Sequence, residues 1–281
     1  MRRIGLVAFL VLILLCSGCA SEKADADVQV VVAIQPQAYF VETLGGDRVQ
    51  VMVMIPPGAN PATYEPAPAQ LRALAEADLY LGISPLPFEQ AWRERLLSVN
   101  PVYYDSAEGI ELDGGDPHIW LSPSLVTQQA KNITAALCEV DEQAADYYQE
   151  RLEAFLAELS ALDQELAESL AGLAGTRFLV YHPAWHYLAR EYGLEQVAIE
   201  VEGNEPGAGQ LAELIEQARA ENVRVLFVSP QHSQRSARMI AEEIGAQVVE
   251  IDPLARDWAG NLHHVAAAFQ FALGESRDGD G

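Results

Sequence analysis

The chain has 281 residues, half of them hydrophobic, and a formal charge of −24. Its length suffices for one large domain or two small ones. So strong an excess of acidic residues argues against a nucleic-acid partner and favours an acidic surface that concentrates cations. Solubility or a saline habitat would explain the same charge. The three cysteines do not predict a disulfide framework.

Residues 1–18 have the pattern of a lipoprotein signal peptide. The apolar run Ile4–Leu15 is too short to span a bilayer as a mature helix. Small residues precede Cys19, as in a lipobox, although Cys16 stands where Leu is usual. We expect Cys19 to be lipidated, with residues 19–27 as a polar tether that holds the protein outside the cytoplasmic membrane. An ordinary signal cut near Ala20, or an uncleaved anchor, is the alternative.

Strands and helices alternate through residues 28–140, which predicts an N-terminal α/β lobe with a parallel sheet. The expected strands are Val28–Ile34, Val49–Ile55, Asp78–Ile83 and Val102–Asp105. The expected helices are Pro36–Leu44, a helix from the end of the Pro-rich loop to Glu76, Pro87–Leu97 and Ser124–Cys138.

Residues 141–173 predict one long rigid helix without internal Gly or Pro up to Ala171. Asp141 is the expected N-cap, and Gly172 and Gly175 end the helix. Its length of about 45 Å exceeds the width of a small domain, so we expect it to join two lobes; a coiled coil is the weaker alternative. The apolar residues at helical spacing are Tyr148, Leu152, Phe155, Leu159, Leu162, Leu166 and Leu170.

The same alternation returns in residues 174–274 and predicts a C-terminal α/β lobe, followed by a frayed tail over 275–281. The expected strands are Arg177–Tyr181, Glu195–Ile199, Arg224–Val228 and Gln247–Ile251. The expected helices are Ala184–Tyr192, Ala208–Ala220, Ser233–Ile244 and Asp257–Leu273. Parallel sheets bind ligands beyond the carboxyl ends of their strands, so the predicted ligand site is the cleft between the lobes.

Three side chains with metal-binding chemistry stand where such sheets present ligands. His182 and Asp252 directly follow expected strands, and His118 lies in a loop of the first lobe. Two imidazoles and a carboxylate suit Zn²⁺, and also Mn²⁺ or Fe²⁺. A histidine at a strand end is more often a hydrogen-bonded structural residue, so spacing alone leaves the metal site open.

Five blocks resemble the zinc/manganese-binding lipoproteins of ABC importers, the ZnuA/TroA-like solute-binding proteins. They are Ile55–Pro66, Asp116–Pro123, Tyr181–Ala189, Ala198–Pro206 and Ile251–Leu254, in family order along nearly the whole mature chain. The resemblance implies two α/β lobes joined by a rigid backbone helix, with a metal ion held between them. It also implies an ABC import permease as partner.

Position by position, the resemblance assigns three metal ligands. His118 corresponds to the second ligand of the family, His182 to the third and Asp252 to the acidic fourth. The first ligand is generally a histidine, and here that position is Ala62. An alanine side chain cannot bind metal, so the first lobe contributes only His118.

Several groups are candidates for the position that Ala62 leaves open. Water is the simplest, because three protein ligands plus water is an ordinary zinc arrangement. Glu65 or Tyr64 belongs to the same loop but would need a shift in register. His186 follows His182 by one helical turn, and His232 follows a strand, although the family often has an aromatic residue there.

These observations predict an extracytoplasmic receptor that captures a divalent transition metal, zinc first and manganese second, for an import permease. One alternative is a zinc-dependent hydrolase with an open coordination position and Glu200, Glu202 or Glu205 as base. The chain has no His-Glu-x-x-His motif, which disfavours that hypothesis. The other alternative is a family member whose metal binding is lost or altered.

Overall fold

The computed structural model describes residues 28–84, 86–100, 102–200, 207–221 and 223–278. The expected signal peptide, the tether and Cys19 lie outside these residues. Among the helices that the structure describes, none combines the length and the apolar character needed to cross a membrane.

The first lobe is a parallel four-stranded sheet with the order β2-β1-β3-β4. Its strands are β1 (Val28–Val32), β2 (Val49–Val53), β3 (Leu79–Gly82) and β4 (Tyr103–Asp105). Its helices are α1 (Gln35–Gly45), α2 (Pro68–Glu76), α3 (Pro87–Val99) and α4 (Pro123–Val140). The central strand β1 is a nearly unbroken run of valines because a parallel strand covered on both faces buries every side chain.

The second lobe repeats this topology with the order β6-β5-β7-β8. Its strands are β5 (Arg177–Val180), β6 (Glu195–Ala198), β7 (Val225–Val228) and β8 (Gln247–Glu250). Its helices are α6 (His186–Glu191), α7 (Ala208–Ala220), α8 (Gln234–Ile244) and α9 (Trp258–Asp278). Two parallel-sheet lobes are therefore confirmed. The expected tail was partly wrong, because α9 continues to Asp278.

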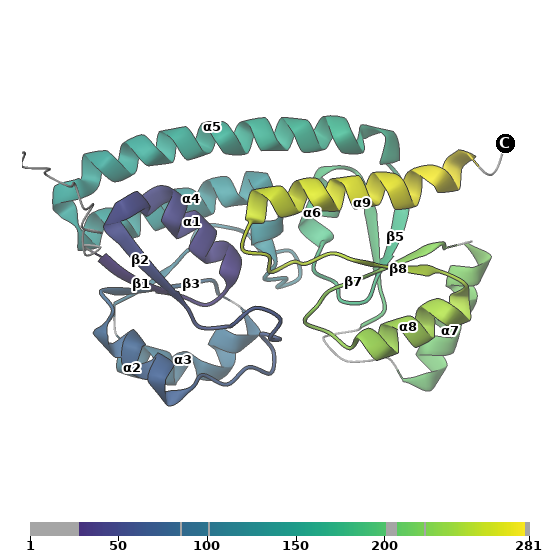
Figure 1. Ribbon diagram of the computed structural model, residues 1–281, viewed down its shortest axis with the longest axis horizontal. Coiled ribbons are helices and arrows are strands. Elements are labelled where there is room, and N and C mark those ends of the chain that lie inside the picture. The colour runs from purple at the N-terminus through teal and green to yellow at the C-terminus, as the bar shows by residue number, and fades with distance from the viewer. Residues whose placement is uncertain (1–27, 85, 101, 201–206, 222, 279–281) are drawn as a thin grey trace, which may run out of the picture.

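The long helix α5 (Ala145–Leu170) runs above both lobes in Figure 1, and its seven expected core residues are all buried. It begins later than predicted, because Glu142–Ala144 form a separate 3-10 turn. Asp141 does not cap the helix: its carboxylate accepts hydrogen bonds from Arg48 at 3.0 Å and Tyr148 at 2.9 Å. A second 3-10 turn, Ala171–Leu173, follows the helix.

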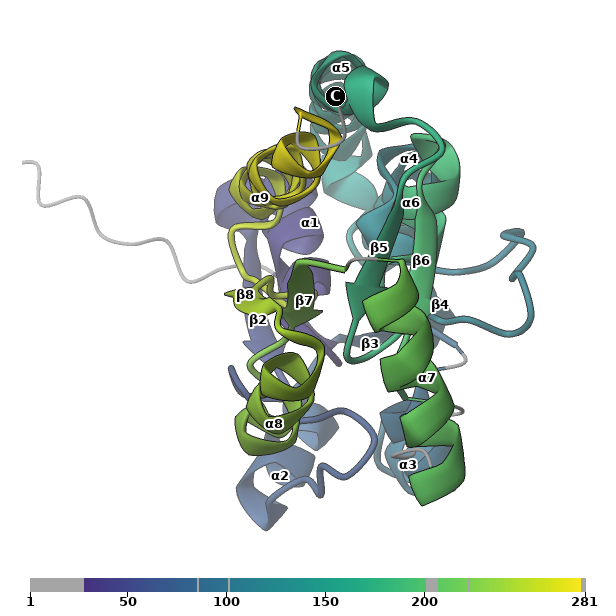
Figure 2. The ribbon, with the colours of Figure 1, turned by 90° about the vertical axis from the view of Figure 1, so that its right-hand side faces the viewer.

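A second helix also connects the lobes. Helix α9 follows the last strand of the second lobe, yet it lies beside α5 (Figures 1 and 2). Its first residue, Trp258, contacts Phe40 of α1 in the first lobe. At that contact the rings of Trp258 and Phe40 are 5.0 Å apart. One apolar core cluster includes residues of both sheets and of both long helices. We therefore expect the lobes to tilt slightly rather than open widely.

The packing of α5 leads to a stability prediction. Leu166→Ala removes a fully buried side chain from the apolar stripe of the helix and should lower the free energy of unfolding by about 2–5 kcal/mol. Glu153→Ala on the exposed face of the same helix should change it by less than about 0.5 kcal/mol. Urea unfolding followed by circular dichroism measures both. Equal effects would mean that burial along α5 does not stabilise the fold.

Candidate metal site

A cavity of about 840 Å³ lies between the two lobes. Residues of the first lobe that line it include Asn60–Thr63 and Asp113–His118, and those of the second lobe include His182, His186, Gln231 and His232. The second-lobe residues follow the carboxyl ends of their strands or begin the helices that come next. The cavity is therefore at the predicted place, where two parallel sheets present their loops to each other.

His118 lies in the loop before the 3-10 turn Ile119–Leu121. The carboxylate of Asp116, two residues earlier, fixes the position of its ring. Its Nδ1 is 2.6 Å from Oδ1 of Asp116, which also accepts the backbone N–H of His118 at 3.0 Å. The ring packs on Trp120, with the ring centroids 5.2 Å apart. Burial lowers the pKa of His118, and the nearby His182 adds to this effect.

His182 follows β5 by two residues and has the same type of support. Its Nδ1 is 2.7 Å from Oε2 of Glu200, which follows β6. Glu200 is only 8% exposed, and a carboxylate so deeply buried requires a hydrogen-bonding partner. In metal sites a carboxylate on Nδ1 sets the tautomer of the ring and directs Nε2 at the ion.

The two histidines meet across the cleft through their remaining nitrogens. Nε2 of His118 and Nε2 of His182 are 3.4 Å apart. Two ligands of a tetrahedral zinc ion bound at 2.0–2.1 Å lie about 3.4 Å from each other. With each Nδ1–H donated to a carboxylate, two lone pairs face the same point. A proton or a cation between them is needed to relieve that repulsion.

Direct bonds between the lobes hold the loop of His118 in place. The indole N–H of Trp120 donates to the carbonyl of Pro253 at 2.7 Å, and Trp258 donates to the carbonyl of Trp120 at 2.6 Å. The hydroxyl of Tyr187 donates to the carbonyl of Asp116 at 2.9 Å and accepts the N–H of Asp113 at 3.0 Å.

Asp252 lies beside the cleft, where its neighbours Pro253 and Leu254 line the cavity. Its Oδ1 accepts hydrogen bonds from the Gln231 amide at 2.7 Å and the Leu254 N–H at 2.8 Å. In the described part of the chain, however, the group of His, Cys, Asp or Glu whose ligand atoms all lie within 4.8 Å of one another is a different one, His182, Glu200 and His232. His118 and Asp252 are not members of that group, so Asp252 as a ligand beside the two histidines stays a prediction.

His232 lines the cavity beside His182. Its ring stacks on His182, with centroids 4.3 Å apart and planes 20° apart. Its Nδ1 is 2.8 Å from the hydroxyl of Ser229, and its Nε2 is 3.7 Å from Oε2 of Glu200 and 3.5 Å from the amide nitrogen of Asn60. Burial, with His182 beside it, lowers the pKa of His232 to about 4.

The other candidates are less well placed. His186 lines the cavity but is 40% exposed, and its Nε2 is 2.9 Å from Asp113. Glu65 is exposed and is not among the residues that line the cavity. Tyr64 donates its hydroxyl to Gln70 at 2.7 Å. Ala62 does line the cavity, so its position faces the cleft without supplying a ligand.

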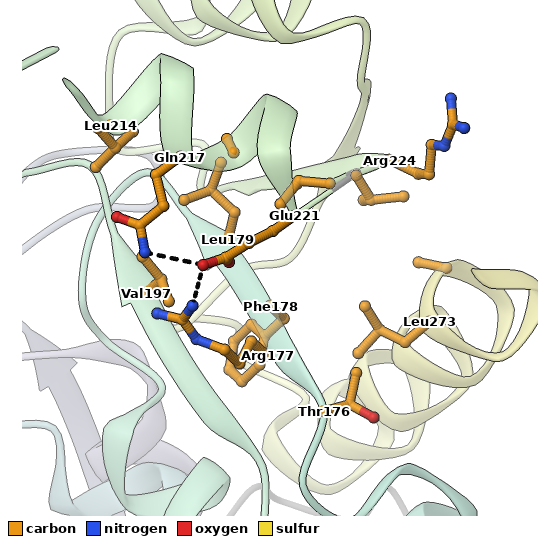
Figure 3. A pocket seen from close by; sticks show the side chains of 14 residues that line it. Thr176, Arg177, Phe178, Leu179, Val197, Leu214, Gln217, Glu221, Arg224 and Leu273 are labelled. Atoms are coloured by element: carbon orange, nitrogen blue, oxygen red, sulfur yellow. Dashed lines mark hydrogen bonds and ion pairs between the residues drawn. The ribbon is translucent and has the colours of Figure 1, made fainter. Parts of the chain in front are cut away.

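A second cavity, of about 510 Å³, lies within the second lobe (Figure 3). It is at the amino ends of β5 and β7, opposite to the histidines, and its lining includes Phe178 and Leu214. Its lining carboxylate, Glu221, accepts hydrogen bonds from Arg177 and Gln217. A mostly apolar cavity whose carboxylate is already paired does not suit a metal ion.

Comparison with known proteins agrees with the two-lobed architecture. The family described as "Zinc-uptake complex component A periplasmic", ZnuA, matches residues 30–271. The chain belongs to the ZnuA family. A crystal structure of ZnuA is 47% identical in sequence to this chain and superposes on it with a TM-score of 0.83. The superposition covers 87% of this chain and 98% of the ZnuA chain.

Curated relatives of this ZnuA-family chain are named for two metals. The high-affinity zinc uptake system protein ZnuA of Bacillus subtilis is 29% identical over 89% of this chain and 88% of its own length. The manganese ABC transporter substrate-binding lipoprotein PsaA of Streptococcus pneumoniae is 28% identical over 84% of this chain and 83% of its own. The resemblance found from the sequence blocks is thus confirmed.

Sequence reasoning missed two supporting residues of this ZnuA-family site. Asp116 was noted only as part of a block, although an Asp two residues before a histidine is well placed to bond its Nδ1. Glu200 was considered only as the base of a hydrolase. The sequence signal for Glu200 was its position just after β6, because His182 likewise stands just after β5.

Tyr187→Phe tests whether the bonds between the lobes position the histidine loop. It removes the two hydrogen bonds to residues 113 and 116 and should lower the free energy of unfolding by about 1–3 kcal/mol. Hydrogen exchange of residues 113–120 should also become faster. The matched control is Tyr192→Phe, whose hydroxyl bonds Asp163 instead. Equal exchange of residues 113–120 in the two variants would contradict this positioning role.

Proposed function

We propose that this protein is an extracytoplasmic receptor that captures a divalent transition metal, zinc in preference to manganese, and delivers it to an ABC import permease. The proposed ligands are His118, His182 and Asp252. The observation that supports this most strongly is the 3.4 Å approach of the two Nε2 atoms, each on a ring whose Nδ1 meets a carboxylate. This arrangement leaves two nitrogens of opposite lobes directed at one ion-sized point.

Zinc is favoured by the donor set. Imidazole suits zinc, whereas manganese is better served by carboxylate, carbonyl and water oxygens. The names of the relatives include both metals, so their names alone do not choose between them. The choice therefore depends on the two half-buried imidazoles of this chain.

The location is proposed from the N-terminus and from the relatives. The pattern before Cys19 supports lipidation there, and PsaA is named a lipoprotein. A lipid at that residue would hold the receptor at the outer surface of the cytoplasmic membrane, close to a permease. The mature acidic chain would raise the local concentration of cations around it.

The hydrolase alternative is weaker than the receptor. A general base must reach a metal-bound water, but Oε2 of Glu200 is bonded to Nδ1 of His182 and the side chain is buried. Glu202 and Glu205 lie outside the described residues. The family consists of substrate-binding components of transporters, which favours a binding protein.

Loss of metal binding is the other alternative, and the site argues against it. A receptor that no longer held a cation would gain nothing from two imidazole lone pairs facing each other in a buried cleft. We propose that the bound metal fixes the relative tilt of the lobes and that the permease recognises this geometry. The connections through α5, α9 and the Trp120 bonds would keep that tilt small.

The direct test is metal binding by the purified mature protein. It should bind one Zn²⁺ per chain, more tightly than Mn²⁺, in competition titrations against a chromophoric chelator. His118→Ala and His182→Ala should weaken zinc binding by more than the roughly 100-fold that is typical for loss of a supporting residue. His264→Ala, an exposed histidine on α9, is the control. A wild-type protein that binds no metal would refute the receptor function.

Zinc affinity should also depend on pH. Protons compete with the metal for imidazole, and burial lowers the pKa of His118. That ring therefore stays neutral somewhat below its ordinary pKa of about 6.5. Affinity should be nearly constant from pH 8 to 6.5 and fall at pH values below about 6. Titrations at pH 7.5, 6.5 and 5.5 measure this, and tighter binding in acid would contradict imidazole ligation.

A further inference from the structure

We infer that His232 is the third imidazole ligand of the bound metal and takes the place that Ala62 leaves open. This inference rests on the proposed function and names the residue that completes the site. It replaces the water molecule that the sequence favoured as the simplest filler.

The first support is a shared pattern of hydrogen bonds. Of the four histidines that line the cavity, three have Nδ1 close to an oxygen. The partners are Asp116 for His118, Glu200 for His182 and Ser229 for His232, at 2.6, 2.7 and 2.8 Å. Nε2 of His118 and Nε2 of His182 approach each other, and Nε2 of His232 lies between the Asn60 amide and Oε2 of Glu200. Anchoring through Nδ1 is how proteins orient an imidazole that binds metal through Nε2.

The tautomer of His232 follows from its neighbours in the first lobe. Oδ1 of Asn60 accepts the backbone N–H of Ala62 at 2.8 Å, which turns the amide nitrogen of Asn60 toward Nε2 of His232 at 3.5 Å. An N–H donor facing Nε2 marks that nitrogen as an acceptor, so Nδ1 carries the proton and donates it to Ser229. Nε2 of His232 is thus the acceptor, and its two neighbours, the Asn60 amide at 3.5 Å and Oε2 of Glu200 at 3.7 Å, are both long contacts.

The second support is position. Nε2 of His232 faces the loop that contains Ala62, the place where the resemblance expects a histidine. The ring is stacked on His182 with the planes 20° apart, so rotation of one ring would direct both Nε2 atoms at one ion. His232 also belongs, with His182 and Glu200, to the group whose ligand atoms lie within 4.8 Å of one another. A ligand missing from one wall of the cleft is therefore matched by an additional imidazole on the opposite wall.

This arrangement has a consequence for selectivity and for the two lobes. Three imidazoles make the site richer in nitrogen and so favour zinc over manganese. The first lobe would contribute His118 alone, while the second would contribute His182, His232 and the carboxylate of Asp252. The second lobe would then hold most of the coordination sphere by itself, and His118 would couple the ion to the first lobe.

The experiment compares two variants in the mature protein loaded with Zn²⁺. His232→Phe keeps an aromatic ring against His182 but removes the nitrogens. His186→Phe is the matched control, because His186 lines the same cavity and bonds Asp113. X-ray absorption counts the imidazoles on the zinc, and competition titrations give the Zn²⁺ and Mn²⁺ affinities. Circular dichroism checks that each variant is folded.

The expected result is three imidazoles on zinc in the wild type and in His186→Phe, and two in His232→Phe. Zinc affinity should fall at least tenfold in His232→Phe, with a smaller change for Mn²⁺. Adding Ala62→His to His232→Phe should restore the third imidazole, whereas Ala62→His alone should tighten binding little. Two imidazoles in a zinc-bound wild type, with His232→Phe unchanged, would overturn the inference and leave the receptor function intact. A wild type that binds no zinc would instead refute the receptor function itself.

Discussion

The site depends on the approach of two imidazole nitrogens that belong to different lobes. Nε2 of His118 and Nε2 of His182 are 3.4 Å apart, and a buried or partly buried carboxylate occupies the other nitrogen of each ring. Such a contact is unfavourable without a positive charge between the rings. The rest of the fold must therefore hold the rings in place, since either one could relieve the repulsion by turning away.

Two long helices and the hydrogen bonds across the cleft prevent this by connecting the two lobes. Helix α5 covers both lobes, and α9 returns from the end of the second lobe so that Trp258 contacts Phe40 of α1. At the cleft, Trp120 and Tyr187 join the two walls through a buried and a part-buried hydrogen bond. A helix packed along its length and hydrogen bonds across the cleft both resist bending. A bound ion would therefore control small tilts of the lobes rather than a wide closure.

Much of this was predictable. The eight strands of the described residues and the stripe of α5 followed from hydrophobic periodicity and from Gly and Pro positions, because those signals are local. What the pattern did not show is that the first turn is a 3-10 turn and that the carboxylate of Asp141 bonds Arg48 from a distant segment instead of capping the helix. The arrangement of the candidate ligands could be predicted from the sequence only in part. His118 and His182 do meet, but the close partner of His182 in the described chain is Glu200 rather than Asp252.

By itself, the sequence determined the two α/β lobes, the long helix between them, the family and the histidines at the strand ends. These follow from patterns within short segments and from blocks of neighbouring residues. Only the tertiary structure decided which nitrogen of each ring is free, that Glu200 and Asp116 hold the rings, and that His232 stacks on His182 and faces the loop of Ala62. Those facts depend on side chains up to 172 residues apart along the chain. Their distances and orientations are set by packing between the lobes, which leaves no local pattern in the sequence.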